Sequence, residues 1–156
     1  MNNENETSIK HNKDVMSNIE KAIALAAKKH MGQRDKANQP YIFHPLRLML
    51  KVKTPEQQIV AVLHDILEDT DTTIVDLISL GFSQEVIDAV DALTKRPHET
   101  RIEAAYRTVK NPIARTVKLA DLADNMDLSR ISQPTARDLL RLEEYKQVHH
   151  ILMSYA

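Results

Sequence analysis

Four ionisable residues interrupt an apolar stretch, AVLHDILEDT, that spans residues 61–70. They are His64, Asp65, Glu68 and Asp69. Burying charge without partners is costly, so these groups must either face water or hold a ligand. Residues four apart share a face of a helix, so we expect His64 and Glu68 to form one row of a single helix. Asp65 and Asp69 would form the adjacent row.

Two further segments carry residues of the same chemical kind. His44 stands in PYIFHP, and VKLADLADNM places Asp121 and Asn125 four residues apart. Lys118 precedes Asp121 by three residues, and Asp124 follows it by three. Two imidazoles and two carboxylates suit a divalent cation such as manganese, iron, cobalt or zinc. A cation would also explain why so many acids gather, because they neutralise its charge.

Each of these residues also has a structural explanation. A single histidine on an apolar face is more often a satisfied core residue than a ligand, and acids on a helix usually form a solvated face. The pair His64–Asp65 followed by Glu68–Asp69 fits a solvated face poorly, because it interrupts an apolar helix. The motif around residues 64–69 therefore carries most of the metal hypothesis.

Composition excludes several classes of protein. The 156 residues suit one domain, and a net charge of −1 gives no support for non-specific nucleic-acid binding. The absence of cysteine removes disulfides and thiol catalysis, and two glycines are too few for a Walker loop or a dinucleotide fingerprint. No apolar run approaches the ~20 residues of a membrane span. We expect a flexible tail at 1–15, a single domain at 16–156 and a cytoplasmic protein.

Helical periodicity runs through the rest of the chain, which predicts an all-α globule of about seven or eight helices. Thr54, Pro55 and Gln57 predict a capping box at the start of one of them. The last helix should turn six residues inward: Leu139, Leu142, Tyr145, Val148, Ile151 and Leu152. The expected helices lie at about 15–31, from the turn at Pro45, 54–70, 73–80, 83–93, 99–109, 111–126 and 135–154.

The motifs HP at 44–45, VLHDILEDT and VKLADLADN together resemble the HD superfamily of metal-dependent phosphohydrolases. Within it, the chain is similar to the hydrolase domain of RelA/SpoT-type alarmone enzymes and to their small stand-alone relatives. The resemblance runs from about Ala22 to Tyr145 and includes GQRDKANQPYIFHPLRLM and DALTKR. It implies a single all-α HD domain.

The resemblance also implies roles for individual residues. The metal ligands would be His44, His64, Asp65 and Asp121, with Mn²⁺ as the usual ion. Glu68 and Asp69 match the acidic pair that positions or deprotonates the attacking water. Lys36, Asn125 and Tyr145 match positions near the nucleotide, and Lys118 is a weaker match.

Two departures from the family pattern bear on the substrate. Asp35 stands where alarmone hydrolases usually carry a basic residue, and Asp124 stands where relatives often have a non-acidic one. We expect hydrolysis of the 3′-pyrophosphate of guanosine tetra- or pentaphosphate. Two alternatives stay open, the same chemistry on a nucleoside phosphate or the 2′-phosphate of NADPH, and a catalytically silent nucleotide-binding domain. The expected partner is a small nucleotide, with neither a membrane nor nucleic acid, and a homo-oligomer stays open.

Overall fold

A computed structural model describes residues 18–155 of the chain. The predicted tail at 1–15 lies outside these residues. The described part is helical, and in it the one β-type pairing is an isolated antiparallel bridge between Arg34 and Pro40. The all-α prediction is therefore confirmed. A helical segment at 18–29 precedes the labelled elements, which are α2 (Phe43–Lys51), α3 (Pro55–Leu63), α4 (Ile66–Asp69), α5 (Ile74–Ser79), α6 (Gln84–Leu93), α7 (Arg101–Thr108), α8 (Pro112–Met126), the 3₁₀ turn η1 (Leu128–Arg130) and α9 (Ala136–Ser154).

Local sequence signals set the beginnings of these helices. The Thr54 side chain accepts a hydrogen bond from the Gln57 backbone N–H while the Gln57 side chain reaches back, so the predicted capping box is present with Pro55 at the first helical position. Ser83 and Asn111 likewise cap α6 and α8. Each cap satisfies a backbone donor that would otherwise lack a partner at the start of its helix.

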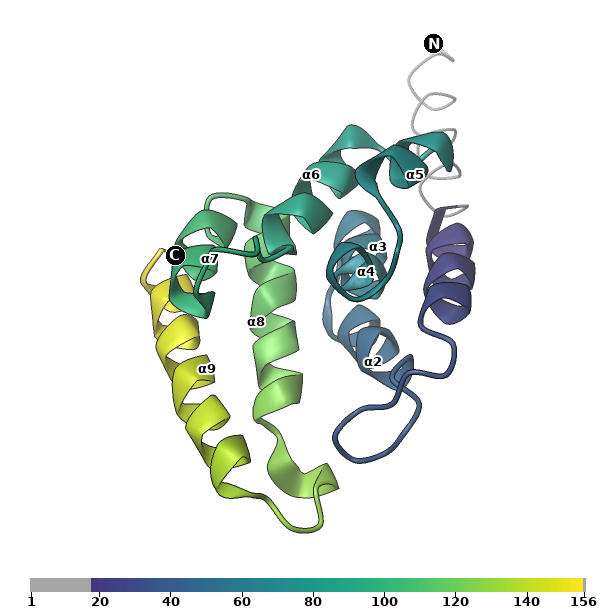
Figure 1. Ribbon diagram of the computed structural model, residues 1–156. Helices are drawn as coiled ribbons and strands as arrows, with labels where there is room; N and C mark the ends of the chain where they lie inside the picture. Colours follow the sequence, from purple (N-terminus) through teal and green to yellow (C-terminus); the bar gives the residue numbers. More distant parts are fainter. Residues whose placement is uncertain (1–17, 156) are drawn as a thin grey trace.

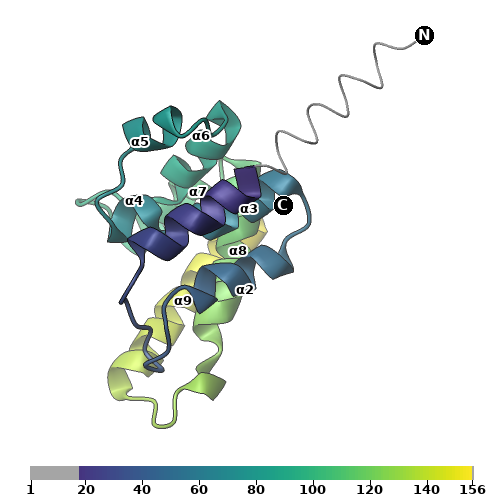
Figure 2. The ribbon, with the colours of Figure 1, turned by 90° about the vertical axis from the view of Figure 1, so that its right-hand side faces the viewer.

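Helix α8 lies between two groups of helices (Figures 1 and 2). On one side, α3 packs against α2, α6 and α8, and all five residues of 59–63 are buried there. On the other side, α7 and α9 enclose a smaller core with α8. Because α8 borders both cores and the C-terminal half of α3 is buried, side chains on these parts of the two helices are held firmly in the middle of the molecule.

Two features of the helices differ from the sequence prediction. The helix expected over 54–70 ends at Leu63 and resumes as α4 at Ile66. In α9, Leu139 is exposed rather than inward, because the buried contacts of this helix come from its C-terminal half, where Val148, Ile151 and Leu152 pack against α7 and α8. In the part of the chain that the structure describes, no helix combines the length and apolarity needed to cross a bilayer.

Candidate metal centre and active site

Three potential metal ligands converge in the middle of the fold. His44 lies in the first turn of α2, His64 at the end of α3 and Asp121 on α8, and all three are buried. The Nε2 atom of His44 is 3.2 Å from His64 Nε2 and 3.0 Å from Asp121 Oδ1. His64 Nε2 is 3.5 Å from the same oxygen. Three of the four predicted ligands thus share one small volume.

The break between α3 and α4 positions the His64–Asp65 pair. Asp65 adopts φ −102° and ψ 4°, in the bridge region between helix and extended conformation. The single helix expected for residues 61–70, with its two adjacent rows of side chains, is therefore wrong. A continuous helix would turn consecutive side chains about 100° apart. The break instead leaves Asp65 Oδ2 3.1 Å from His64 Nε2.

Hydrogen bonds on the outer ring nitrogens fix how both histidines face the centre. His64 Nδ1 lies 2.8 Å from the carbonyl oxygen of Ala61, which can only accept, so Nδ1 carries the proton. His44 Nδ1 likewise lies 2.6 Å from Asp124 Oδ2. In the neutral rings, both Nε2 lone pairs then point toward the Asp121 carboxylate. Three electron-pair donors aimed at one point fit a divalent cation.

The charges around this centre favour ionised carboxylates. Burial alone would raise the pKa of Asp121, but Lys118 and the two histidines hold it well below its ordinary value. Burial alone would lower the pKa of His64, but Asp65 and Asp121 outweigh burial and raise it well above the usual range. The centre therefore attracts positive charge, which either protons or a metal ion can supply.

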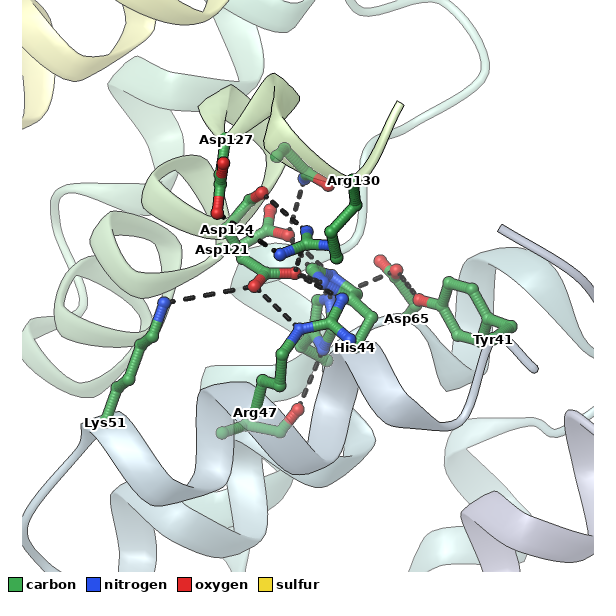
Figure 3. Close-up of polar contacts among 12 residues, drawn as sticks. Tyr41, His44, Arg47, Lys51, Asp65, Asp121, Asp124, Asp127 and Arg130 are labelled. Atoms are coloured by element: carbon green, nitrogen blue, oxygen red, sulfur yellow. Dashed lines mark hydrogen bonds and ion pairs between the residues drawn. The ribbon is translucent and has the colours of Figure 1, made fainter. Parts of the chain in front are cut away.

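Asp65, the fourth predicted ligand, lies at the edge of the centre. It accepts a hydrogen bond from the Tyr41 hydroxyl, and its side chain is partly exposed (Figure 3). Tyr41 in turn packs its ring against those of His30 and His44. The structure thus brings Asp65 beside the three buried donors but also joins it to Tyr41, a residue of the PYIFHP motif to which the sequence prediction gave no role.

The two predicted catalytic acids open onto different cavities. Asp69 lines a cavity of about 520 Å³, whereas Glu68 lines a smaller one of about 130 Å³, and Asp65 borders both. Burial, followed by the charges of Asp65 and Glu68, raises the pKa of Asp69 to about 6, which suits a proton acceptor near neutral pH. Glu68 Oε1 accepts a hydrogen bond of 2.9 Å from the Lys95 backbone N–H.

The four residues predicted to bind substrate fall into two pairs. Lys118 Nζ is 2.7 Å from Asp121 Oδ2, and Asn125 Nδ2 donates to Asp121 Oδ1 at 2.8 Å, so both hold the candidate ligand. Lys36 and Tyr145 meet each other, with the Lys36 ammonium 5.9 Å from the centre of the Tyr145 ring. The guanidinium of Arg101 lies 5.2 Å from the same ring. Tyr145 thus has two cations beside it.

The sequence departures at Asp35 and Asp124 have local explanations. Asp35 Oδ1 accepts hydrogen bonds from the backbone N–H groups of Ala37 and Gln39, both at 2.9 Å, and so closes the loop before α2. Asp124 is buried and accepts hydrogen bonds from His44 and Arg47. Both acids are therefore satisfied by nearby donors.

The sequence prediction gave no role to Tyr41, Arg47 or Arg130, and it treated Asp124 as a departure that bears on the substrate. One signal was available for two of them, because Arg47 follows His44 by three residues just as Asp124 follows Asp121. Side chains at that spacing share a helix face, so each residue points the same way as a candidate ligand. Arg130 sits in the turn after α8, where no periodic pattern could place it.

Comparison with known proteins finds related hydrolases, although not through a family model. No family model matches the chain. The chain is 36% identical over 120 residues to the guanosine-3′,5′-bis(diphosphate) 3′-pyrophosphohydrolase of Aquifex aeolicus, a match that covers 69% of this chain but 17% of that protein. It is 36% identical over 139 residues to the enzyme of the same name, MESH1, of Mus musculus, which covers 80% of this chain and 76% of the mouse protein.

A solved structure supports the same relationship. It is described as a metazoan orthologue of SpoT that hydrolyses ppGpp, and it superposes with a TM-score of 0.72 and 26% identity. The match covers 86% of this chain and 85% of that one. The identity to the mouse relative, the shared fold and the converging two histidines and aspartate lead to one conclusion. The chain belongs to the family of SpoT-like HD-domain hydrolases.

Proposed function

We propose that this protein is a metal-dependent hydrolase that removes the 3′-pyrophosphate from guanosine tetra- and pentaphosphate. One observation carries the proposal: the buried group His44, His64 and Asp121 lies beside two cavities whose walls contain basic residues. The names of the Aquifex and mouse relatives supply the reaction.

His44, His64 and Asp121 would hold the cation, with Asp65 as a fourth ligand and Mn²⁺ as the expected ion. When bound, the cation supplies Lewis-acid polarisation of a phosphoryl oxygen and acidifies water. Lys118 and Asn125 keep the Asp121 carboxylate in place through both of its oxygens. These contacts orient the ligand before substrate arrives, which reduces the reorganisation that binding requires.

Asp69 would take the proton of the attacking water, because its raised pKa matches a base working near neutral pH. Glu68 would orient the water from the other cavity, with its own carboxylate held by the backbone N–H of Lys95. The two acids thus receive separate roles. Asp69 would be the base. Glu68 would be positioned by the loop after α6, through its hydrogen bond from the Lys95 backbone N–H.

The two cavities support a substrate that carries two separate diphosphate groups. The larger one is lined by Arg34, Lys36, Arg47 and Arg130 among others, and the smaller one by Lys95, Arg101 and Lys118. A nucleotide with diphosphates on its 3′ and 5′ positions carries negative charge at both ends. Basic residues on both sides of the centre can neutralise both ends. Lys36, Asn125 and Tyr145 would contact the nucleotide.

A substrate panel tests the proposal. The Mn²⁺-loaded protein is given guanosine tetraphosphate, NADPH and GTP, and released pyrophosphate and phosphate are measured separately, with Asp65→Asn as the blank. We expect pyrophosphate from guanosine tetraphosphate alone. Release of phosphate from NADPH alone would show that the substrate is the 2′-phosphate of NADPH and not guanosine tetraphosphate. If no compound yields product although metal is bound, the remaining hypothesis is a catalytically silent nucleotide-binding domain.

A further inference from the structure

The Asp124 carboxylate contacts one histidine and three cationic side chains beside the metal centre, the most distant being the Lys51 ammonium at 3.9 Å from Oδ1. It is 2% exposed, and its Oδ2 lies 2.6 Å from His44 Nδ1. Arg47 donates from Nε to Oδ1 and from Nη2 to Oδ2, both at 2.9 Å. Arg130 Nη2 lies 3.1 Å from the Asp124 carbonyl oxygen and 3.4 Å from Oδ2. Figure 3 shows the two arginines approaching this carboxylate from different sides.

The geometry points to Asp124 as the positioning residue of the metal centre, the group that holds His44 with Nε2 turned toward His64 and Asp121. We propose this role for Asp124, with Arg47 as the residue that holds Asp124 in turn. The inference rests on the proposed metal site. It goes beyond that proposal because it assigns a role to residues outside the ligand set.

Helix geometry explains why these residues act together. Asp121 and Asp124 are one turn apart on α8, and His44 and Arg47 are one turn apart on α2. Residues at this spacing lie on one face, so each helix presents a candidate ligand and a supporting residue to the other helix. His44 contacts both aspartates, and Asp124 contacts both α2 residues. Any shift of α2 along α8 would break all of these contacts.

A carboxylate on the outer nitrogen of a ligating histidine has two effects. It fixes which nitrogen carries the proton, and it prevents the ring from rotating about the Cβ–Cγ bond. Without Asp124, the His44 ring would lose the partner that fixes its orientation, while Arg47 and Arg130 would lose a buried counter-charge. Loss of such outer partners typically weakens metal binding about 10- to 100-fold.

The experiment measures Mn²⁺ affinity by titration calorimetry, without substrate, for the full chain and its variants. We expect Asp124→Ala to weaken binding about 10- to 100-fold. Asp124→Asn should weaken it less, because the amide oxygen can still accept from His44. The matched control is Asp127→Asn, an acid one residue beyond α8 that pairs with Arg130 but has no bond to His44. It should bind within about twofold of the parent.

Two further measurements keep the outcomes distinct. Thermal melting shows whether each variant folds, and if the alanine variant does not, the asparagine variant decides. Parent-like affinity in the folded Asp124 variants would overturn the positioning role, provided that His64→Ala loses Mn²⁺. If His64→Ala also binds Mn²⁺ like the parent, the metal site itself is misplaced and the proposed function fails with it.

Discussion

Two clusters of charged side chains in this fold are satisfied in opposite ways. One is the group His44, His64 and Asp121 between α2, α3 and α8, in which three electron-pair donors face one another. The other joins the end of α6 to α7, where Arg107 forms two hydrogen bonds with the Glu99 carboxylate. The remaining Arg107 donors reach the carbonyl oxygens of Asp91, Ala92 and Thr94.

The way in which each cluster is satisfied distinguishes a binding site from a network that only stabilises the fold. In the Arg107 cluster each donor meets an acceptor, so the protein alone completes the network. In the histidine cluster the ring Nδ1–H groups point outward. The two Nε2 atoms face each other and the Asp121 carboxylate, so a positively charged partner would complete this network. An arrangement that the chain does not complete by itself is a candidate for a ligand site.

Removing a histidine should have the largest effect on function. We expect His64→Ala to lower turnover on the order of a thousandfold, because a bound cation contributes several kcal/mol to stabilising the transition state. The melting temperature of the metal-free protein should fall little, since the substitution relieves the crowding of Nε2 atoms at 3.2 Å. Initial rates and a melting curve on the same sample check both expectations. A large drop in melting temperature would make His64 a structural residue.

Removing the arginine of the other cluster should give the opposite result. We expect Arg107→Ala to lower the free energy of unfolding by about 2–4 kcal/mol, because the partly buried Glu99 carboxylate loses its cation and the carbonyl oxygens of Ala92 and Thr94 each lose one of two donors. Turnover of the folded fraction should stay close to that of the parent. Denaturant unfolding measures the first quantity.

The exposed pair of Lys146 and Glu143 supplies the control for that variant. Lys146→Ala should cost less than about 1 kcal/mol, as surface pairs do. Equal losses in the Arg107 and Lys146 variants would remove the distinction between a support and a surface pair.

A smaller effect should appear in the pH dependence of stability. The hydrogen bond from Arg107 lowers the pKa of Glu99 from 4.5 to about 2. The folded pKa lies below the unfolded one, so this contribution is fully present above about pH 4.5 and is lost as the pH falls toward 2. The difference in unfolding free energy between the parent and Glu99→Gln should therefore shrink over that interval. A difference that stays constant between pH 5 and pH 2.5 would contradict this assignment.

Sequence patterns predicted the elements better than their junctions. Capping residues such as Thr54 and Gln57 are local signals, and both act as expected. Neither glycine nor proline occurs at the break between His64 and Asp65, so no local sequence signal predicts it. It arises from the packing that brings α3 and α4 to the same centre, a tertiary effect that overrides helical propensity.

The candidate site follows the same division. Adjacent His64 and Asp65 indicated the centre, His44 and Asp121 were further candidates by residue type, and the family motifs gave all four the role of ligands. The bond between Arg47 and Asp124 joins residues 77 positions apart, which a single sequence cannot pair. The cytoplasmic location and the exact ion stay predictions.

The most direct test of the central claim is anomalous diffraction from crystals of the protein grown with Mn²⁺. We expect one anomalous peak per chain, within coordination distance of His44 Nε2, His64 Nε2 and Asp121 Oδ1. The peak should disappear in Asp121→Asn crystals grown in the same way. A peak at other residues, or none in the parent at saturating Mn²⁺, would contradict the account.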